Sequence, residues 1–526
     1  MKNHIHVGAA LALTSIASAQ LRPTFAKAQF RVDLSQEVRP GEAVLELRAF
    51  EARGGRVRLE LEDRIFTEFR DDGGEMDQRP FDGIFTGVVR TDLQEERAIA
   101  RRLEEAASRG VEIPIFDGRE LVARVNSRHL VKPTSSMTIP VHVHSASTTV
   151  EEDHSLMIID PTVFADLNHS FNPCTGVGNP DGAWAFGHVM TELAGTHDPS
   201  VFAMDWLSNW GAAQTVNGHT SPARAATMNQ VLSVWDPLGT GVLDMDAAPF
   251  HPIAIVLRLD LRETNGYSAG SAGEARIIYS FVDENCQAGP LGFLAIFEYA
   301  INKTGCDVRQ WGQDWADLSG LPLGSTAYND ALAALTTQFT DLTSSPNANE
   351  LGQLRTNEFI PGLPEDWQLR EFRLDSSGLL EQVSVKLTPP NSMNGGAIVT
   401  SIMNGGGPAL SSIEGASSEV PIPPSSFFWF GNSTVLTDDR HEFSLNTCNG
   451  CHGGEVGTFF THVNWTVPGV QATLSPFLTG ISMPDAAGSG VVRPFNDLDR
   501  RRQDLQNLVD GSCFGGILHQ PAAFTH

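Results

Sequence analysis

The chain has 526 residues, of which 41% are hydrophobic and 19% are charged. This composition is typical of a globular protein, and the length is sufficient for several domains. The 63 acidic residues outnumber the 36 basic ones and leave a formal net charge of −27. This charge disfavours nucleic acids and anionic membrane surfaces as partners, because both would repel the chain.

The first 19 residues have the pattern of a cleavable export signal. Lys2 supplies a positive start, residues 7–16 form a short apolar run, and Ala17-Ser18-Ala19 provides a cleavage site. The apolar run is too short to stay in a bilayer as an anchor. We therefore expect an exported protein, periplasmic or extracellular, whose mature chain has no membrane span.

Residues 30–126 are predicted to form a β-sandwich-like module. Alternating apolar residues on both sides of Gly54-Gly55 predict a β-hairpin that turns at these glycines. The segment 71–87 resembles a loop-and-strand signature of secreted immunoglobulin-like modules. Thr91 is a suitable cap for a helix that ends before Gly110, so we expect one helix attached to the sandwich.

A segment rich in Ser, Thr and His, residues 127–155, is expected to lead into the next domain. His142 and His144 lie on one face of an extended strand, because side chains alternate with a period of two. His154 follows at a distance. Two histidines on one face can bind zinc or copper, but we favour the interpretation that these are surface residues.

Residues 155–390 are predicted to form one large mixed α/β domain, in which helices alternate with short strand-like runs. The spacing of apolar residues places helices at 186–194, 201–210, 307–318 and 325–342, and strand-like runs at 253–261, 277–282, 294–299, 354–358 and 367–372.

Ten charged residues interrupt the apolar runs of this domain: Arg258, Asp260, Arg262, Glu274, Arg276, Glu298, Arg355, Glu358, Arg370 and Glu371. Charges in such runs either face solvent or pair with one another in the interior. We favour a structural ion-pair network. The alternative is a pocket in which a carboxylate such as Glu298 performs acid–base chemistry, as in a secreted hydrolase.

Residues 391–426 are rich in Gly, Ser, Pro and Asn, which is the composition of a linker. A linker here would separate a C-terminal module, residues 427–526, from the large domain. A last helix is predicted at 499–509. Three consecutive arginines from Arg500 lie in its first turn, and we expect most of them on a solvated face.

The C-terminal module contains Cys448-Asn449-Gly450-Cys451-His452, the Cys-x-x-Cys-His pattern by which c-type haem is attached. In a helical turn, positions i, i+3 and i+4 share a face, so both thiols and the imidazole can meet one flat ligand. Cys448 and Cys451 would become thioethers to the haem vinyl groups, and His452 would be the proximal iron ligand. A disulfide, half of a zinc site and a redox dithiol are the alternatives.

The apolar approach to this motif resembles the first helix of a class I cytochrome c. Met483-Pro484 is similar to the loop that supplies the axial thioether in that family, although it lies only 31 residues after His452. The resemblance therefore implies Met483 as a candidate distal ligand, with His462 as its competitor and an open, five-coordinate iron as a third arrangement. A methionine would raise the reduction potential, and a second histidine would lower it.

Six cysteines are present, and an oxidising compartment disfavours unpaired thiols. When the two cysteines of the motif are assigned to haem, four remain. Cys286 and Cys306 are close in sequence and are the first choice for a disulfide, which leaves Cys174 to pair with Cys513. Three disulfides without haem would satisfy the same count.

From residue 155 to about 515, the chain is similar to a family of uncharacterised exported bacterial proteins with a C-terminal cytochrome c-like module. The shared elements are Asn-Pro-Cys-Thr-Gly at 172–176, Arg-Leu-Asp-Leu-Arg at 258–262, Leu-Arg-Thr-Asn-Glu at 354–358, Leu-Arg-Glu-Phe at 369–372 and Thr-Cys-Asn-Gly-Cys-His at 447–452. The resemblance implies export and the haem motif, but no reaction.

The combined patterns predict a multidomain α+β protein: a β-sandwich-like module, a large mixed domain and a small, mainly α cytochrome c-like module. The expected cofactor is covalent haem c. The expected role is electron transfer or another haem-linked redox role, with a redox partner that the sequence does not identify. The alternatives are a secreted binding or surface protein with a disulfide at the motif, and a carboxylate-dependent secreted hydrolase. Whether the protein is an enzyme stays open.

Overall fold

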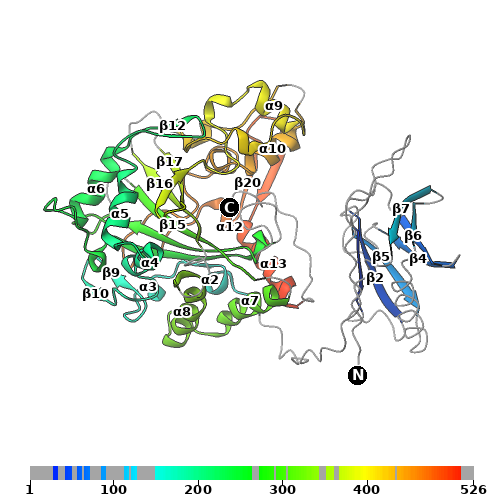
Figure 1. Ribbon diagram of the computed structural model, residues 1–526, viewed down its shortest axis with the longest axis horizontal. Coiled ribbons are helices and arrows are strands. Elements are labelled where there is room, and N and C mark those ends of the chain that lie inside the picture. Colours follow the sequence, from blue (N-terminus) through cyan, green and yellow to red (C-terminus); the bar gives the residue numbers. More distant parts are fainter. Residues whose placement is uncertain are drawn as a thin grey trace. The chain divides into compact units, whose positions relative to one another are not determined.

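The computed structural model divides the chain into two compact units, residues 1–143 and 144–526, which are described separately (Figure 1). In the first unit, the structure describes the backbone of seven strands between residues 28 and 126. In the second unit, it describes residues 149–262, 272–288, 292–303, 306–342, 351–360, 367–432 and 435–510. The predicted export signal and both His142 and His144 lie outside the described residues.

The strands of the first unit form one antiparallel sheet with the order β1-β2-β5-β4-β3-β6-β7. They are β1 Ala28–Asp33, β2 Glu42–Ala49, β3 Arg56–Leu61, β4 Arg64–Arg70, β5 Ile84–Arg90, β6 Glu112–Asp117 and β7 Glu120–Asn126. The predicted hairpin at Gly54-Gly55 is wrong. β2 pairs with β1 and β5, whereas β3 pairs with β4 and β6, so the two glycines join strands that are not neighbours. The helix predicted after Thr91 lies outside the described residues.

The second unit is organised around an eight-stranded antiparallel sheet with the order β18-β17-β16-β15-β14-β13-β8, and β19 also pairs with β17. This sheet, together with its helices, confirms the mixed class predicted for the chain. Its strands are β8 Met157–Ile158, β13 Phe250–Arg258, β14 Glu274–Phe281, β15 Gly292–Ala300, β16 Leu351–Phe359, β17 Trp367–Leu374, β18 Leu380–Val383 and β19 Ser418–Val420.

Three two-stranded sheets complete the strands of the second unit: β9 Phe171–Asn172 with β10 Val177–Gly178, β11 Gln214–Val216 with β12 His219–Ser221, and β20 Ile481–Pro484 with β21 Val492–Phe495. The helices are α2 Glu152–Ser155, α3 Pro161–Phe164, α4 Phe186–Ala194, α5 Pro199–Ser208, α6 Ala225–Trp235, α7 Cys306–Asp317, α8 Thr326–Thr340, α9 Ala397–Met403, α10 Thr437–Leu445, α11 Cys448–Cys451, α12 Pro476–Thr479 and α13 Asp497–Asp510. None of the described helices has the length and apolar composition that a membrane crossing requires.

Local chemistry explains where the longer helices begin. Asp198 caps α5 by accepting a hydrogen bond from the backbone N–H of Val201, and Pro199 occupies the first turn. Ser325 caps α8 in the same way, with Tyr328 as the donor. Both caps are formed by residues within three positions of the helix start. The helices predicted from apolar spacing at 186–194, 201–210, 307–318 and 325–342 correspond to α4, α5, α7 and α8.

The eight-stranded sheet is buried on both faces. β13 and β14 are buried at every residue, so the charged residues that interrupt their apolar sequences are also buried. Because side chains alternate along a strand, Ile277 and Phe297 belong to the face that packs against α4–α8 in the largest apolar core. Figure 1 shows these helices, coloured green to cyan, gathered around the strands.

The other face of the sheet is covered by the chain that follows β17. Val256, Ile278 and Leu294 pack there with Cys451 in one apolar cluster, and Trp367 packs with Cys448 in another. The predicted linker, residues 391–426, is folded into the same unit: α9 contributes to the cluster around Trp367, and β19 pairs with β17. The C-terminal segment therefore shares its apolar core with the sheet, which differs from the predicted separate module.

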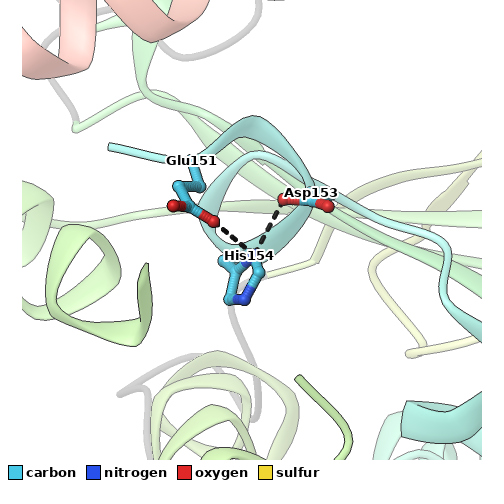
Figure 2. Close-up of side chains that lie close together, drawn as sticks. All are labelled: Glu151, Asp153 and His154. Atoms are coloured by element: carbon cyan, nitrogen blue, oxygen red, sulfur yellow. Dashed lines mark hydrogen bonds and ion pairs between the residues drawn. The ribbon is translucent and has the colours of Figure 1, made fainter. Parts of the chain in front are cut away.

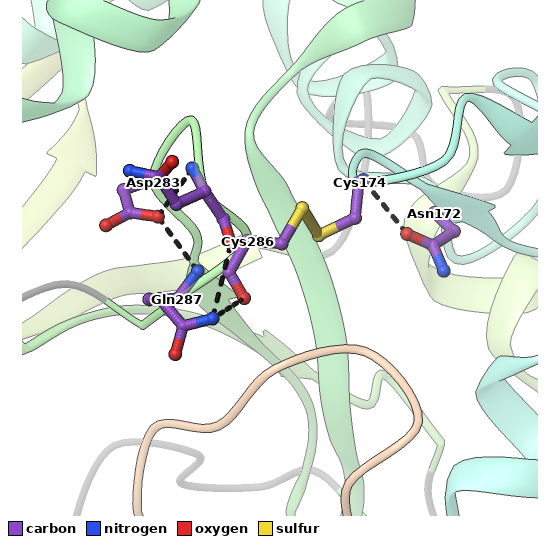
Figure 3. The surroundings of a disulfide bond; sticks show 6 residues. Asn172, Cys174, Asp283, Cys286 and Gln287 are labelled. Carbon is purple, nitrogen blue, oxygen red and sulfur yellow. Dashed lines mark hydrogen bonds between the residues drawn. A yellow bond between two sulfur atoms is a disulfide. The ribbon is translucent and has the colours of Figure 1, made fainter.

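A disulfide joins Cys174 to Cys286, with 5.5 Å between their Cα atoms (Figure 3). It connects the turn between β9 and β10 to the loop after β14. The predicted bond between Cys286 and Cys306 is therefore wrong, because Cys286 already has a partner that is 112 residues away in sequence. Cys513 and the side chain of Cys306 lie outside the described residues.

Candidate functional site

The Cys-x-x-Cys-His motif folds as one helical turn, α11, which is the condition that the haem interpretation requires. The hydroxyl of Thr447 caps α11 by accepting a hydrogen bond from the backbone N–H of Gly450, at 3.2 Å. His452 ends the turn, and its N–H donates to the carbonyl of Cys448 at 2.8 Å. A side chain at Gly450 would collide with the backbone of Ser444, so the tight approach of α10 to α11 requires glycine at this position.

Both thiols of the motif are free and fully buried. Burial raises the pKa of Cys448 and raises the pKa of Cys451 well above its usual value. A redox dithiol requires an accessible sulfur with a lowered pKa. The structure therefore disfavours dithiol exchange at this pair.

The imidazole of His452 is held by two contacts. Its Nδ1 atom forms a short hydrogen bond with the carbonyl oxygen of Phe460. The ring of Trp367 lies nearly parallel to it, with 4.6 Å between ring centroids and 19° between ring planes. Burial lowers the pKa of His452 to about 4, so the ring is neutral near pH 7. A neutral ring that donates from Nδ1 keeps Nε2 as a lone-pair donor, the form in which histidine binds metals.

His462 lies beside His452, with 4.7 Å between ring centroids. Its Nε2 atom is 3.4 Å from the Sγ atom of Cys451, and its Nδ1 atom is 2.9 Å from the hydroxyl of Ser475. Burial lowers the pKa of His462 well below its usual value, and His452 adds to this effect. Two neutral imidazoles and one thiol of the motif are thus brought together.

Met483 takes a different position. It lies in β20, partly buried at the edge of the cluster around Cys451. Its sulfur lies against Gly457, where an added Cβ would be 2.8 Å away. His452 and His462 line a common cavity, and Met483 is not part of that lining. Of the two candidate distal ligands, the structure brings His462 next to His452.

The cavity that His452 and His462 share lies between the motif and the sheet and is called here the histidine cavity. Its apolar wall comes from Met157, Val256, Ile278, Leu294, Ile296, Leu369, Val463, Phe477 and Leu478, and its polar wall from Arg258, Arg276, Glu298, Arg355, Asn357 and Arg501. Apolar and polar residues thus line the cavity in nearly equal number, and the convergence of polar groups within apolar surroundings is a feature of ligand sites.

The two histidines of this cavity and the adjoining motif suit haem in their chemistry. Cys448, Cys451 and His452 have the attachment spacing, and His462 lies beside His452, but neither cysteine lines the cavity. The arginines of the lining are already paired with carboxylates of the protein. The volume, about 70 Å³, is smaller than a porphyrin requires. Binding would therefore need the two imidazoles to separate and the cavity to widen.

The charged residues of the strands form a buried chain of ion pairs, called here the ion-pair ladder: Glu274, Arg276, Glu298, Arg355 and Glu371. Successive partners are 2.7, 3.5, 3.6 and 3.2 Å apart. Strand register creates the ladder, since Arg276 lies opposite Glu298 and Arg355 lies opposite Glu371. The predicted structural network is confirmed by these pairs. Glu298 is held between two arginines and also accepts from Gln353 at 2.6 Å, which disfavours it as a general base.

Two arginines at the start of α13 form ion pairs with acidic residues of α13 and of the turn that follows β13. Arg500 pairs with Asp260, at 3.1 Å, and with Asp497. Arg501 is buried, pairs with Asp497 and lines the histidine cavity. The predicted solvated face is therefore wrong for these two residues, because α13 packs against the turn that follows β13.

Arg440 organises a buried cluster that the sequence analysis missed. Its guanidinium donates to both carboxylate oxygens of Glu455, at 2.7 and 2.8 Å, and to Asp485 at 2.7 Å. His441 bonds to the same Glu455. The two carboxylates, Glu455 and Asp485, and His441 are residue types that could hold a metal, but Arg440 already neutralises the carboxylates. The cluster ties α10 to the segment after the motif. Of its residues, only Arg440 and His441 are adjacent in sequence. No short sequence pattern therefore predicts the cluster.

His154 lies with Glu151 and Asp153 at the start of the second unit (Figure 2). Its Nδ1 atom is 2.8 Å from Asp153 and 3.4 Å from Glu151. Both carboxylates are exposed and approach the same ring nitrogen. The side chain of His154 is only 14% exposed, and its ring packs edge-on against Tyr328. The favoured interpretation of a surface residue is therefore met by the two carboxylates and only in part by His154.

Comparison of the chain with protein-family models, with curated proteins and with solved structures finds no match.

Proposed function

We propose that this protein is an exported c-type haem protein with a role in electron transfer or another redox process. Cys448 and Cys451 would hold the haem through thioethers, and His452 would be the proximal ligand. Haem supplies one-electron redox chemistry where it is bound. The observation that carries the proposal is that the motif forms one capped helical turn whose histidine shares a buried cavity with a second histidine.

His462 is our choice for the distal ligand, because it lines the same cavity as His452 and Met483 does not. The contacts of His452 with Phe460 and Trp367 would keep its ring in one orientation. The apolar wall of the cavity would exclude water from the iron. Two histidine ligands would lower the reduction potential relative to a histidine–methionine pair.

The test is covalent haem on the exported chain. The full-length gene product would be expressed with its own N-terminal segment in a bacterium that matures c-type cytochromes. Haem is then measured by peroxidase staining of a denaturing gel and by the mass of the intact chain. We expect one haem per chain and none after the double change Cys448→Ala and Cys451→Ala.

A matched control separates haem loss from misfolding. Val456 is buried in the same cluster as Cys451, and Val456→Ala removes apolar contacts without touching the motif. This variant should retain haem even if its stability falls. A haem-free wild-type chain, purified from cells that load a reference cytochrome, would overturn the proposal. A Cys448–Cys451 bond found by peptide mapping of that chain would support the binding-protein alternative.

A further inference from the structure

A second cavity lies beside the beginning of β13 and is called here the His251 cavity. Its volume is about 200 Å³. Three segments far apart in sequence form its walls: α3 with the β9–β10 turn, residues 251–253, and the loop 467–470. It shares no lining residue with the histidine cavity. The motif therefore has no part in it.

Two buried polar side chains line this cavity. Ser170 is 2% exposed and His251 is 4% exposed. Among the described residues, the Ser170 hydroxyl has no hydrogen-bond partner, and the ring of His251 has only weak backbone contacts with Ser280 and Val467. A buried polar group without such a partner costs about 1–3 kcal/mol. A bound molecule with a hydrogen-bonding group would relieve this cost.

The charges around the cavity favour an uncharged ligand. Burial lowers the pKa of His251 to about 3, so the ring is neutral near pH 7 and offers one donor and one acceptor. Asp166 also lines the cavity, but its carboxylate already accepts hydrogen bonds from the backbone of Asn168 and His169 and from the Asn329 amide. Among the described residues that line the cavity, no charged side chain lacks hydrogen-bond partners, so none requires an ion of opposite charge in the ligand.

The mouth of the cavity is apolar and open to solvent. Leu167, Val177 and Val470 belong to the lining, yet they are 62%, 50% and 54% exposed. Large apolar side chains that are exposed together at the rim of a hollow are typical of a ligand-binding groove. The cavity thus has an apolar entrance, and its buried end carries the Ser170 hydroxyl, which has no partner among the described residues, and the weakly bonded ring of His251.

One wall of the cavity is held in place covalently. The disulfide of Cys174 ties the β9–β10 turn to Cys286, and Asn172 accepts a hydrogen bond from the backbone N–H of Cys174 at 2.9 Å (Figure 3). On the other side of the bond, Asp283 accepts from the backbone N–H of Gln287 at 2.8 Å. A wall fixed before binding lowers the entropic cost of association.

We propose that the His251 cavity binds a small uncharged organic molecule whose single hydroxyl or carbonyl group contacts His251 and Ser170. The apolar body of the ligand would lie under Leu167, Val177 and Val470. An apolar cavity of about 150 Å³ holds a benzene ring, so a volume of about 200 Å³ accommodates one ring with one substituent. This inference does not rest on the proposed haem function.

Phenol and toluene are suitable probes, because they share a ring and differ in a hydroxyl and a methyl group. Their affinities for the purified exported chain would be measured by ligand-observed NMR titration. Phenol should bind about five- to tenfold more tightly than toluene, the effect of one hydrogen bond to an otherwise unsatisfied group. Equal affinities, or no binding of either probe, would overturn the proposal.

Variants at the mouth and at the buried end locate the site. Val470→Trp places a large side chain at the mouth and should abolish binding of both probes. Val242 is 66% exposed and is not part of the lining, so Val242→Trp is the matched control and should bind both normally. Ser170→Ala should reduce the preference for phenol while toluene still binds. Unchanged binding by Val470→Trp would place the probes elsewhere and overturn the proposal.

Discussion

Trp367 lies almost flat against His452, with 4.6 Å between ring centroids and 19° between ring planes. The indole is itself oriented, because its Nε1 donates to the side-chain oxygen of Asn357 at 2.9 Å. At the edge of the imidazole, Nδ1 of His452 is hydrogen-bonded to the carbonyl oxygen of Phe460. Phe460 itself has a backbone φ of 59°. This left-handed conformation is uncommon for a residue other than glycine. The sheet and the segment after the motif thus jointly set the plane of the imidazole.

The first prediction concerns Trp367. Trp367→Leu should lower the free energy of unfolding by about 2–4 kcal/mol, because a fully buried ring and its stacking are lost. Trp367→Phe keeps a ring against His452 and loses the bond to Asn357, so it should cost about 1–2 kcal/mol. Urea unfolding of the purified chain measures both. Phe459→Leu, at a residue that is 65% exposed, is the control and should change stability by less than about 0.5 kcal/mol.

The second prediction distinguishes His462 from Met483 and rests on the proposed haem. His462→Ala should change the haem absorption spectrum from that of a six-coordinate iron, because it removes the distal imidazole. Met483→Leu should leave the spectrum unchanged. His462→Met should raise the midpoint potential, since a thioether ligand favours the reduced iron. The opposite pattern, with a spectral change in Met483→Leu alone, would assign the distal position to Met483.

The third prediction concerns the ion-pair ladder. Glu298→Gln removes the carboxylate that Arg276 and Arg355 share, but Arg276 keeps Glu274 and Arg355 keeps Glu371. The expected cost is therefore that of losing hydrogen bonds to a charged group, about 2–3 kcal/mol. Arg373 pairs with Glu371 at 2.9 Å but is 44% exposed, so Arg373→Ala should cost less than about 1 kcal/mol. Thermal or denaturant unfolding tests the contrast. Similar costs for the two variants would argue against a buried network.

The fourth prediction concerns pH. Burial lowers the pKa of His251 from 6.5 to about 3, so the unfolded chain binds a proton at this residue before the folded chain does. Its contribution to stability is complete above about pH 6.5 and is lost as the pH falls towards 3, by about 1.4 kcal/mol per pH unit. His251→Gln removes this titration. The variant should therefore lose less stability than the wild type between pH 6.5 and pH 4, as measured by urea unfolding at each pH.

The fifth prediction concerns the disulfide. Peptide mapping without reduction should yield Cys174 linked to Cys286. The double change Cys174→Ser and Cys286→Ser should lower the free energy of unfolding by about 2–5 kcal/mol, because the bond closes a loop with a sequence separation of 112. A peptide that links Cys286 to Cys306 would contradict the structure and restore the pairing favoured by sequence proximity.

Features that depend on neighbouring residues were accessible from the sequence. Apolar spacing located α4, α5, α7 and α8, and the segment of Cys448, Cys451 and His452 folds as the helical turn on which the haem interpretation depends. The charges in the strands were correctly assigned to a network, because buried charges require partners. In each case the information lies within a few residues of the element that it predicts.

Tertiary structure decided which distant residues meet. Strand register placed Arg276 opposite Glu298, and the order of the strands left Gly54-Gly55 without a hairpin. The pairing of β19 with β17 made the predicted linker part of the core. Cys286 bonded to Cys174, and His462 rather than Met483 reached His452. These outcomes depend on contacts between segments that are far apart in sequence, which composition and spacing do not encode, because apolar packing is non-directional and selects partners only in the assembled core.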